Sequence, residues 1–94
     1  MNTKKKADKF FKQQKFNKAI KIYKKSVSKN ISSQKKCINL NQIGLCYFNL
    51  KQYNDAFNFF EKALTLHKVH DIYSNAGSCL TLLKLYDKAM DYYL

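Results

Sequence analysis

Apolar and small residues recur at spacings of three and four along most of the chain, which places them on one face of an α-helix. The clearest run is Leu40, Ile43, Gly44, Tyr47 and Leu50. A polar interruption, LKQYND, follows, and a second run then continues through Ala56, Phe57, Phe60, Ala63 and Leu64. This pattern predicts two antiparallel amphipathic helices joined by a short turn.

The same pattern occurs in two other segments. The third segment has Tyr73, Ala76, Gly77, Leu80 and Leu83, a break at KLYDK, and then Ala89, Met90 and Tyr93. The first segment is weaker and has Ala7, Phe10 and Phe11, a break at QQKF, and then Phe16, Ala19, Ile20, Tyr23 and Val27. The chain therefore repeats one helix pair.

The spacing between the segments is uneven. The alanines after the breaks, Ala19, Ala56 and Ala89, are 37 and 33 residues apart. We expect the extra length in the polar stretch SKNISSQ (28–34), as a longer turn with Ser32 or Ser33 as the helix N-cap. Glycine within a helix costs about 1 kcal/mol relative to alanine, so Gly44 and Gly77 indicate close approach of a partner helix.

A period near 34, a helix–turn–helix unit and this order of small and large residues resemble the tetratricopeptide repeat. The second unit fits best, with Tyr53 as the inter-helix aromatic and these signature positions: Leu40, Ile43, Gly44, Tyr47, Ala56, Phe60 and Ala63. The resemblance implies a single all-α domain over 1–94, a right-handed superhelical solenoid of antiparallel helix pairs. Its units would span approximately 1–31, 35–68 and 69–94. Ile31 and Lys68 replace the usual proline near the unit ends, which predicts looser turns.

Composition agrees with a small helical domain. The chain has 94 residues, of which 46% are apolar, with two glycines and no proline. It has no run of about 18 apolar residues that could span a membrane. Its basic start lacks the apolar core of a secretory signal, and a mitochondrial presequence is the alternative interpretation. Three cysteines without paired spacing favour a reducing compartment, so we expect the cytoplasm, with the nucleus as alternative.

The third unit stops at Leu94, within its second predicted helix. A solenoid normally ends in a unit with a polar outer face, and DYYL is not such an end. We therefore expect the chain to be a fragment of a longer array. The alternative is that another chain covers this face.

No residue pattern indicates catalysis, a cofactor or a metal site. His67 and His70 are three residues apart, but they straddle the break between two units and are expected to be exposed loop residues. Cys46 and Cys79 occupy the same place in their repeats, which indicates packing rather than a nucleophile or a disulfide. We therefore expect a protein that is not an enzyme.

Function must then lie on a surface. Stacked units would align one face of each first helix into a concave groove. The groove residues expected on this face are Lys4, Phe11 and Lys12 in the first unit, Ile38, Asn41, Gln42, Leu45, Phe48 and Asn49 in the second, and Ser74, Asn75 and Ser78 in the third, with Asp8, Asp71 and Thr81 on the same stripe. Phe11, Leu45 and Phe48 could anchor apolar side chains of a peptide, and the asparagines could bond to its backbone. The alternative is that Leu45 and Phe48 pack against neighbouring helices.

A subset of the tetratricopeptide repeat family clamps the acidic C-terminal tails of heat-shock chaperones. Of the five clamp positions, only Lys4 fits. Asp8 stands in place of an asparagine, Gln42 is a near match, and Asp71 and Asn75 replace a basic pair. Chaperone-tail binding is therefore disfavoured.

Charge is concentrated at one end of the chain. Residues 1–36 contain thirteen lysines and one acidic residue, whereas residues 37–94 carry five of each sign. The expected basic patch consists of Lys5, Lys9, Lys18, Lys21, Lys25 and Lys29. We expect a protein–protein interaction module that holds a peptide or helix of a partner, an acidic one being favoured. The alternative is RNA or DNA binding through this patch, although the lack of arginine disfavours specific recognition.

Overall fold

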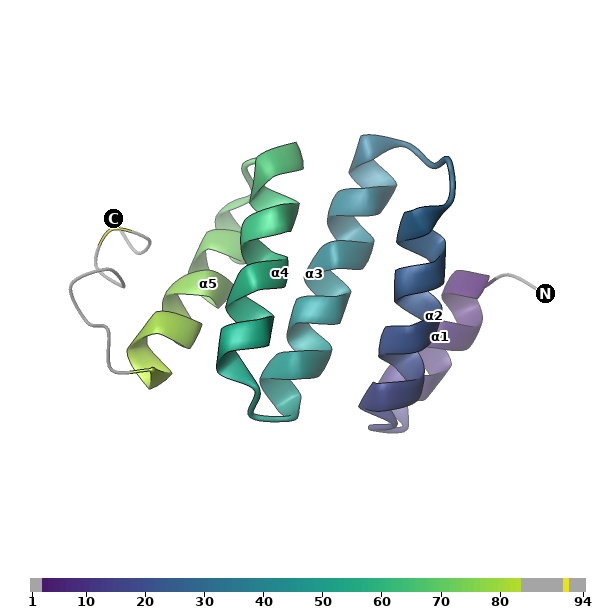
Figure 1. Ribbon diagram of the computed structural model, residues 1–94, viewed down its shortest axis with the longest axis horizontal. Helices are drawn as coiled ribbons and strands as arrows, with labels where there is room; N and C mark the ends of the chain where they lie inside the picture. The colour runs from purple at the N-terminus through teal and green to yellow at the C-terminus, as the bar shows by residue number, and fades with distance from the viewer. Residues whose placement is uncertain (1–2, 84–90, 92–94) are drawn as a thin grey trace.

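The computed structural model describes residues 3–83 and residue 91. Within residues 3–83 the chain forms five α-helices and no strand: α1 (Thr3–Lys12), α2 (Phe16–Ser28), α3 (Ser33–Asn49), α4 (Tyr53–Leu66) and α5 (His70–Leu82). The helices follow one another along the molecule in chain order, with α1 and α2 at one end and α5 at the other (Figure 1). The all-α helical repeat expected from the sequence is confirmed. The expected second helix of the third unit, with Tyr86, Ala89, Met90 and Tyr93, lies outside the described residues.

The turns inside the first two units have the same backbone structure. Gln14 and Lys51 both have positive φ, at 59° and 62°. In each turn the residue that follows donates its N–H to a carbonyl five residues earlier: Lys15 to Phe10 at 2.8 Å and Gln52 to Tyr47 at 2.9 Å. This pattern is a Schellman-type helix end, which usually carries glycine because a side chain disfavours positive φ. The repeat is therefore present in the backbone as well as in the sequence.

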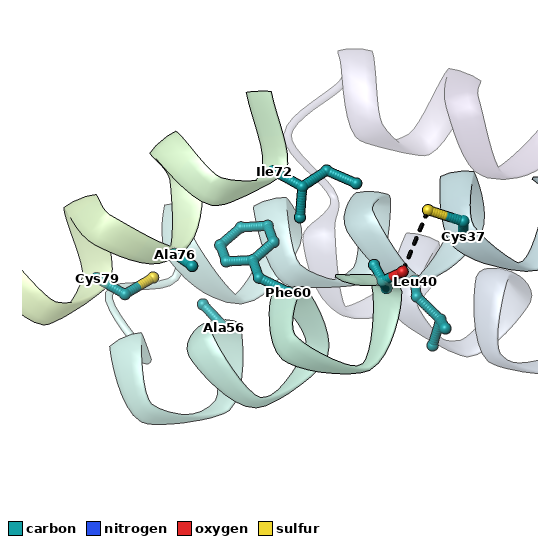
Figure 2. Packing of buried hydrophobic residues seen from close by; sticks show 8 residues of the cluster. Cys37, Leu40, Ala56, Phe60, Ile72, Ala76 and Cys79 are labelled. Atoms are coloured by element: carbon teal, nitrogen blue, oxygen red, sulfur yellow. Dashed lines mark hydrogen bonds between the residues drawn. The ribbon is translucent and has the colours of Figure 1, made fainter. Parts of the chain in front are cut away.

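Two clusters of buried side chains form the core. One joins α1, α2 and α3 through Ala7, Ala19, Ile20, Tyr23, Ile43 and Cys46. The other joins α3, α4 and α5 through Cys37, Leu40, Ala56, Phe60, Ala63, Ile72, Ala76 and Cys79, most of which are labelled in Figure 2. Helix α3 contributes to both clusters, and Tyr47 and Phe59 pack against each of them. The core is thus continuous across the units, as stacking of repeats requires.

The interface within the second unit depends on Gly44. A Cβ atom at this position would lie 2.5 Å from Cε1 and 2.6 Å from Cδ1 of the Phe60 ring. The ring is fully buried between the helices, so it has little room to move away. The expected close approach at Gly44 is confirmed, and the group that approaches is an aromatic side chain rather than the partner backbone.

The extra length between the first and second units lies mainly in a helix. Helix α3 begins eleven residues before Gly44, whereas α5 begins seven residues before the equivalent Gly77. The loop 29–32 is only one residue longer than the loop 67–69. The expectation of a long turn over 28–34 is therefore wrong, because residues 33–36 form an additional first turn of α3. The expected N-cap is confirmed, since the Ser32 side chain accepts a hydrogen bond from the Lys35 N–H at 3.2 Å.

The contact between Gly44 and Phe60 yields a stability prediction. Gly44→Ala should lower the free energy of unfolding by about 1–2 kcal/mol, because overpacking a buried ring outweighs the gain in helix propensity. Urea denaturation followed by circular dichroism measures the change. In a Phe60→Leu background the same substitution should cost much less, because the shorter side chain leaves room for a methyl group. An equal cost in both backgrounds would show that the ring does not set the penalty.

Candidate peptide-binding groove

The expected groove residues come from the first helix of each unit, namely α1, α3 and α5. Helices α3 and α5 contact each other directly, although α4 lies between them in sequence. Asn75 Nδ2 of α5 donates a hydrogen bond to Asn41 Oδ1 of α3 at 3.2 Å, joining the two helices across this face. The amide hydrogens of Asn41 and the Oδ1 of Asn75 retain capacity for a bound peptide.

Two other amide side chains on this surface are less accessible to a ligand. Asn49 Nδ2 donates to the Leu45 carbonyl of its own helix at 2.8 Å. The Oε1 of Gln42 is buried and meets no hydrogen-bond partner among the described residues. A buried acceptor is not accessible to a ligand, so Asn41 and Asn75 are the amides best placed to bond to one.

The proposed apolar anchors differ in exposure. Leu45 and Phe48 are half-buried and pack against the α3–α5 cluster, and the Phe48 ring lies 5.3 Å from the Tyr53 ring, edge to face. Phe11 is also half-buried, with its ring 5.4 Å from that of Phe16. Ile38 is 47% exposed. These contacts favour the alternative that Leu45 and Phe48 serve packing, and they make Ile38 the most accessible apolar side chain of the groove.

The groove surface of α5 is polar, and its hydroxyl groups form hydrogen bonds to backbone carbonyls of the same helix. The Ser78 hydroxyl donates to the Ser74 carbonyl at 3.0 Å, and the Thr81 hydroxyl donates to the Gly77 carbonyl at 3.1 Å. Such bonds to the preceding helical turn use the hydroxyl groups as donors within the helix. Asp71 is exposed in the first turn of the helix.

The residue that replaces an asparagine in the chaperone-tail clamp has a structural partner. The Asp8 carboxylate of α1 accepts a hydrogen bond from the hydroxyl of Tyr23 in α2. Tyr23 is fully buried, and burial together with this bond raises the pKa of its hydroxyl. Asp8 therefore ties the first helix pair together and does not provide the amide donor that the clamp uses.

The lysines of the expected basic patch are all exposed on α1, α2 and the start of the following loop. The Lys18 ammonium lies 5.7 Å from the centre of the Phe10 ring. Sequence analysis missed a second arrangement, in which Lys24 lies 5.5 Å from the Tyr47 ring and 5.4 Å from the Phe59 ring. Lys24 Nζ also donates to the Tyr47 hydroxyl at 3.0 Å, so this lysine links α2 to α3.

The expectation that His67 and His70 are both exposed loop residues is wrong. His67 is half-buried, and its Nε2 lies 3.1 Å from the hydroxyl of Ser33. His70 is exposed but is the first residue of α5. The described residues contain no group of three or more histidine, cysteine or acidic side chains that could hold a metal ion. His67 therefore joins the end of α4 to the start of α3, within the second helix pair.

The three cysteines are buried, which confirms the packing role expected for Cys46 and Cys79. Burial raises the pKa of both thiols from 9.0 to about 12. Cys37 donates to the Ala63 carbonyl at 3.4 Å, the dashed line in Figure 2, and burial also raises the pKa of its thiol. Thiols with raised pKa values stay protonated at neutral pH, and a protonated thiol is a poor nucleophile.

A pocket of about 300 Å³ opens where α1, the end of α2 and the start of α3 meet. Two expected groove residues, Lys4 and Ile38, line it together. Sequence analysis missed its other lining residues Ser26, Ile31, Lys35 and Asn39, and it assigned Lys29 to the basic patch. Lys35 reaches this place from the first turn of α3.

Residues 40–68 match the family model of the tetratricopeptide repeat. This chain carries a tetratricopeptide repeat. The match covers the second unit from Leu40 in α3 to the loop after α4, which is the unit that fits the family's signature positions best. The resemblance inferred from the sequence is thereby confirmed.

A solved structure is similar in fold along nearly the whole chain. The crystal structure of the TPR domain of Arabidopsis FLU superimposes with a TM-score of 0.84, covering 97% of this chain and 85% of that chain. The two sequences are 17% identical, so the similarity is one of fold. No curated protein matches this chain in sequence. No helix of the described part of the chain is long and apolar enough to cross a membrane.

Thiol burial predicts a loss of stability in alkaline solution. The unfolded thiols of Cys46 and Cys79 ionise near pH 9.0 and the folded ones near pH 12, so the unfolded state loses its protons first as the pH rises. The free energy of unfolding should fall between pH 9 and pH 12 by up to about 1.4 kcal/mol per pH unit for each thiol. Urea denaturation in a reducing buffer at several pH values measures this slope.

Cys46→Ala is the control for that experiment. The variant retains all lysines and tyrosines, so it shares every other alkaline effect, and its slope should be shallower than that of the wild type. If the free energy of unfolding fell equally steeply with pH in the variant and the wild type, the Cys46 thiol would not contribute to the pH dependence.

Proposed function

We propose that the chain is a non-enzymatic interaction module that binds a peptide or helix of an acidic partner protein in the groove formed by α1, α3 and α5. The observation that carries the proposal is the hydrogen bond from Asn75 to Asn41, which joins the groove faces of two successive units into one surface. Repeat proteins use such extended concave surfaces for binding.

The chemistry of the groove suits a peptide ligand. Asn41 and Asn75 offer a donor and an acceptor that can pair with one peptide backbone. Ile38 lies on the same helix and supplies exposed apolar surface for a side chain of that peptide. A few apolar anchors with precisely placed polar groups are sufficient to fix the orientation of a bound segment.

Charge supports an acidic partner. Residues 1–36 carry thirteen lysines against one acidic residue, and Asp8 is engaged with Tyr23. A surface of one sign accelerates association with a partner of opposite sign. Binding of RNA or DNA is the second candidate function, because all six lysines of the basic patch are exposed.

Affinity capture followed by binding measurements tests the proposal. Capture from a nuclease-treated lysate at physiological and high salt should retain a protein partner through both conditions. Loss of all material on nuclease treatment or at high salt would favour nucleic acid, whose binding falls steeply with ionic strength.

The captured partner segment then allows a direct test of the groove. Ile38→Ser should weaken its binding by about tenfold, because the substitution removes the exposed anchor. The matched control is Leu66→Ser, which removes a similarly exposed apolar side chain (37% exposed) from α4, outside the groove. Leu45 and Phe48 are less suitable, since polar substitution of these half-buried side chains would also destabilise the fold. Equal affinities of both variants would place the binding surface elsewhere.

A further inference from the structure

One lysine connects the first helix pair to both helices of the second. Lys24 of α2 is exposed, and its Nζ donates a hydrogen bond to the Tyr47 hydroxyl of α3 at 3.0 Å. The same ammonium lies 5.4 Å from the centre of the Phe59 ring of α4. Tyr47 comes nine residues after Ile38, and each helical residue turns by about 100°, so the two side chains leave α3 on opposite sides. The connection therefore lies on the side of α3 away from the proposed groove.

The two contacts of this ammonium differ in kind. Its distance to the centre of the Tyr47 ring is 5.5 Å, nearly the hydrogen-bond length plus the distance from the ring centre to the hydroxyl oxygen. The ammonium is thus at the hydroxyl edge of Tyr47, and this contact is a hydrogen bond from a charged donor. Phe59 has no hydroxyl, and its ring attracts the ammonium through the negative charge of the ring face. The two rings stack with their centres 5.5 Å apart, so one ammonium reaches both.

The first helix pair is attached to the rest of the described chain mainly through one helix contact. Helix α1 packs on α2, and α2 packs on α3 through the cluster that contains Ile20, Tyr23 and Ile43. Helix α4 packs mainly on α3 and α5, so α2 and α4 lie on either side of α3 (Figure 1). Lys24 bridges these two helices across α3. Such a bridge opposes rotation of the first helix pair about its contact with α3.

We propose that Lys24 is a conformational link that fixes the orientation of the first helix pair relative to the second. Apolar packing between α2 and α3 holds the pairs together, but hydrophobic attraction is non-directional. A hydrogen bond requires a particular direction, and so does a contact with a ring face. Because α1 moves with α2, loss of the link would change the spacing between α1 and α3. The proposal does not rest on the peptide-binding function, since it concerns the chain without a ligand.

A second lysine at the same ring provides a matched control. Lys62 of α4 is exposed, and its ammonium lies 4.6 Å from the centre of the Phe59 ring. It follows Phe59 by three residues on the same helix, so this contact joins no two helices. Lys24→Gln and Lys62→Gln each remove one cation from the ring. Only Lys24→Gln breaks a connection between the helix pairs.

Native-state hydrogen exchange of the full chain measures the opening of each helix. Lys24→Gln should accelerate exchange of the protected amides of α2 by about fivefold, the equivalent of about 1 kcal/mol for one exposed contact between a cation and a ring. Amides of α4 and α5 should change by less than about twofold, because they lie in the units beyond the broken link. Lys62→Gln should leave exchange of α2 at the wild-type rate. Lys24→Arg keeps the charge and should retain most of the protection.

Residual dipolar couplings measure the orientation of the helices separately from their stability. The couplings of α2, α3 and α4 in the wild type should fit one rigid arrangement. In Lys24→Gln the couplings of α3 and α4 should still fit it, whereas those of α2 should not. A contribution to stability alone would accelerate exchange and leave the couplings of α2 unchanged.

Three results would overturn the proposal. Equal acceleration of α2 in Lys24→Gln and Lys62→Gln would assign the effect to the Phe59 ring rather than to the link. Equal acceleration in all five helices would indicate a general loss of stability. Wild-type couplings of α2 in Lys24→Gln would show that apolar packing alone determines the orientation.

Discussion

The Phe60 ring occupies the space that a side chain at position 44 would fill, and α3 and α4 can pack only because that space is empty. Their contact places Phe60 among Ala56, Ile72 and Ala76, so the same ring supports α5. Since α5 carries Asn75, the hydrogen bond that joins the groove faces depends on this packing. The proposed binding surface therefore depends on the packing of Phe60 against Gly44.

The fold itself uses much of the hydrogen-bonding capacity along the proposed groove. Along α3 and α5, most hydroxyl and amide groups bond to their own helix or to each other. This arrangement leaves few of these groups for a ligand of the proposed groove. At the pocket, the apolar side chains of Ile31 and Ile38 lie near Lys29 and Lys35.

Sequence periodicity predicted the helix pairs, their order and the buried alanines, because spacing and residue size report directly on which face packs. It also predicted the Ser32 cap, whose chemistry is local. It placed the extra length in a longer turn over 28–34, because that stretch is polar, although the chain is already helical from Ser33 at the exposed start of α3. The pocket could not be predicted, because the periodicity of single helices does not report how the ends of α1, α2 and α3 meet.

Nearly all tertiary contacts join helices adjacent in the chain: α1 with α2, α2 with α3, α3 with α4, and α4 with α5. Forming such contacts closes only short loops, so the search for the native topology carries a small entropy cost and folding is expected to be fast. The order of assembly is also unconstrained, because any helix pair can serve as a nucleus and its neighbours can add to either side. The shared helix α3 would be the most protected part of the backbone against hydrogen exchange, and the two ends of the row would open first.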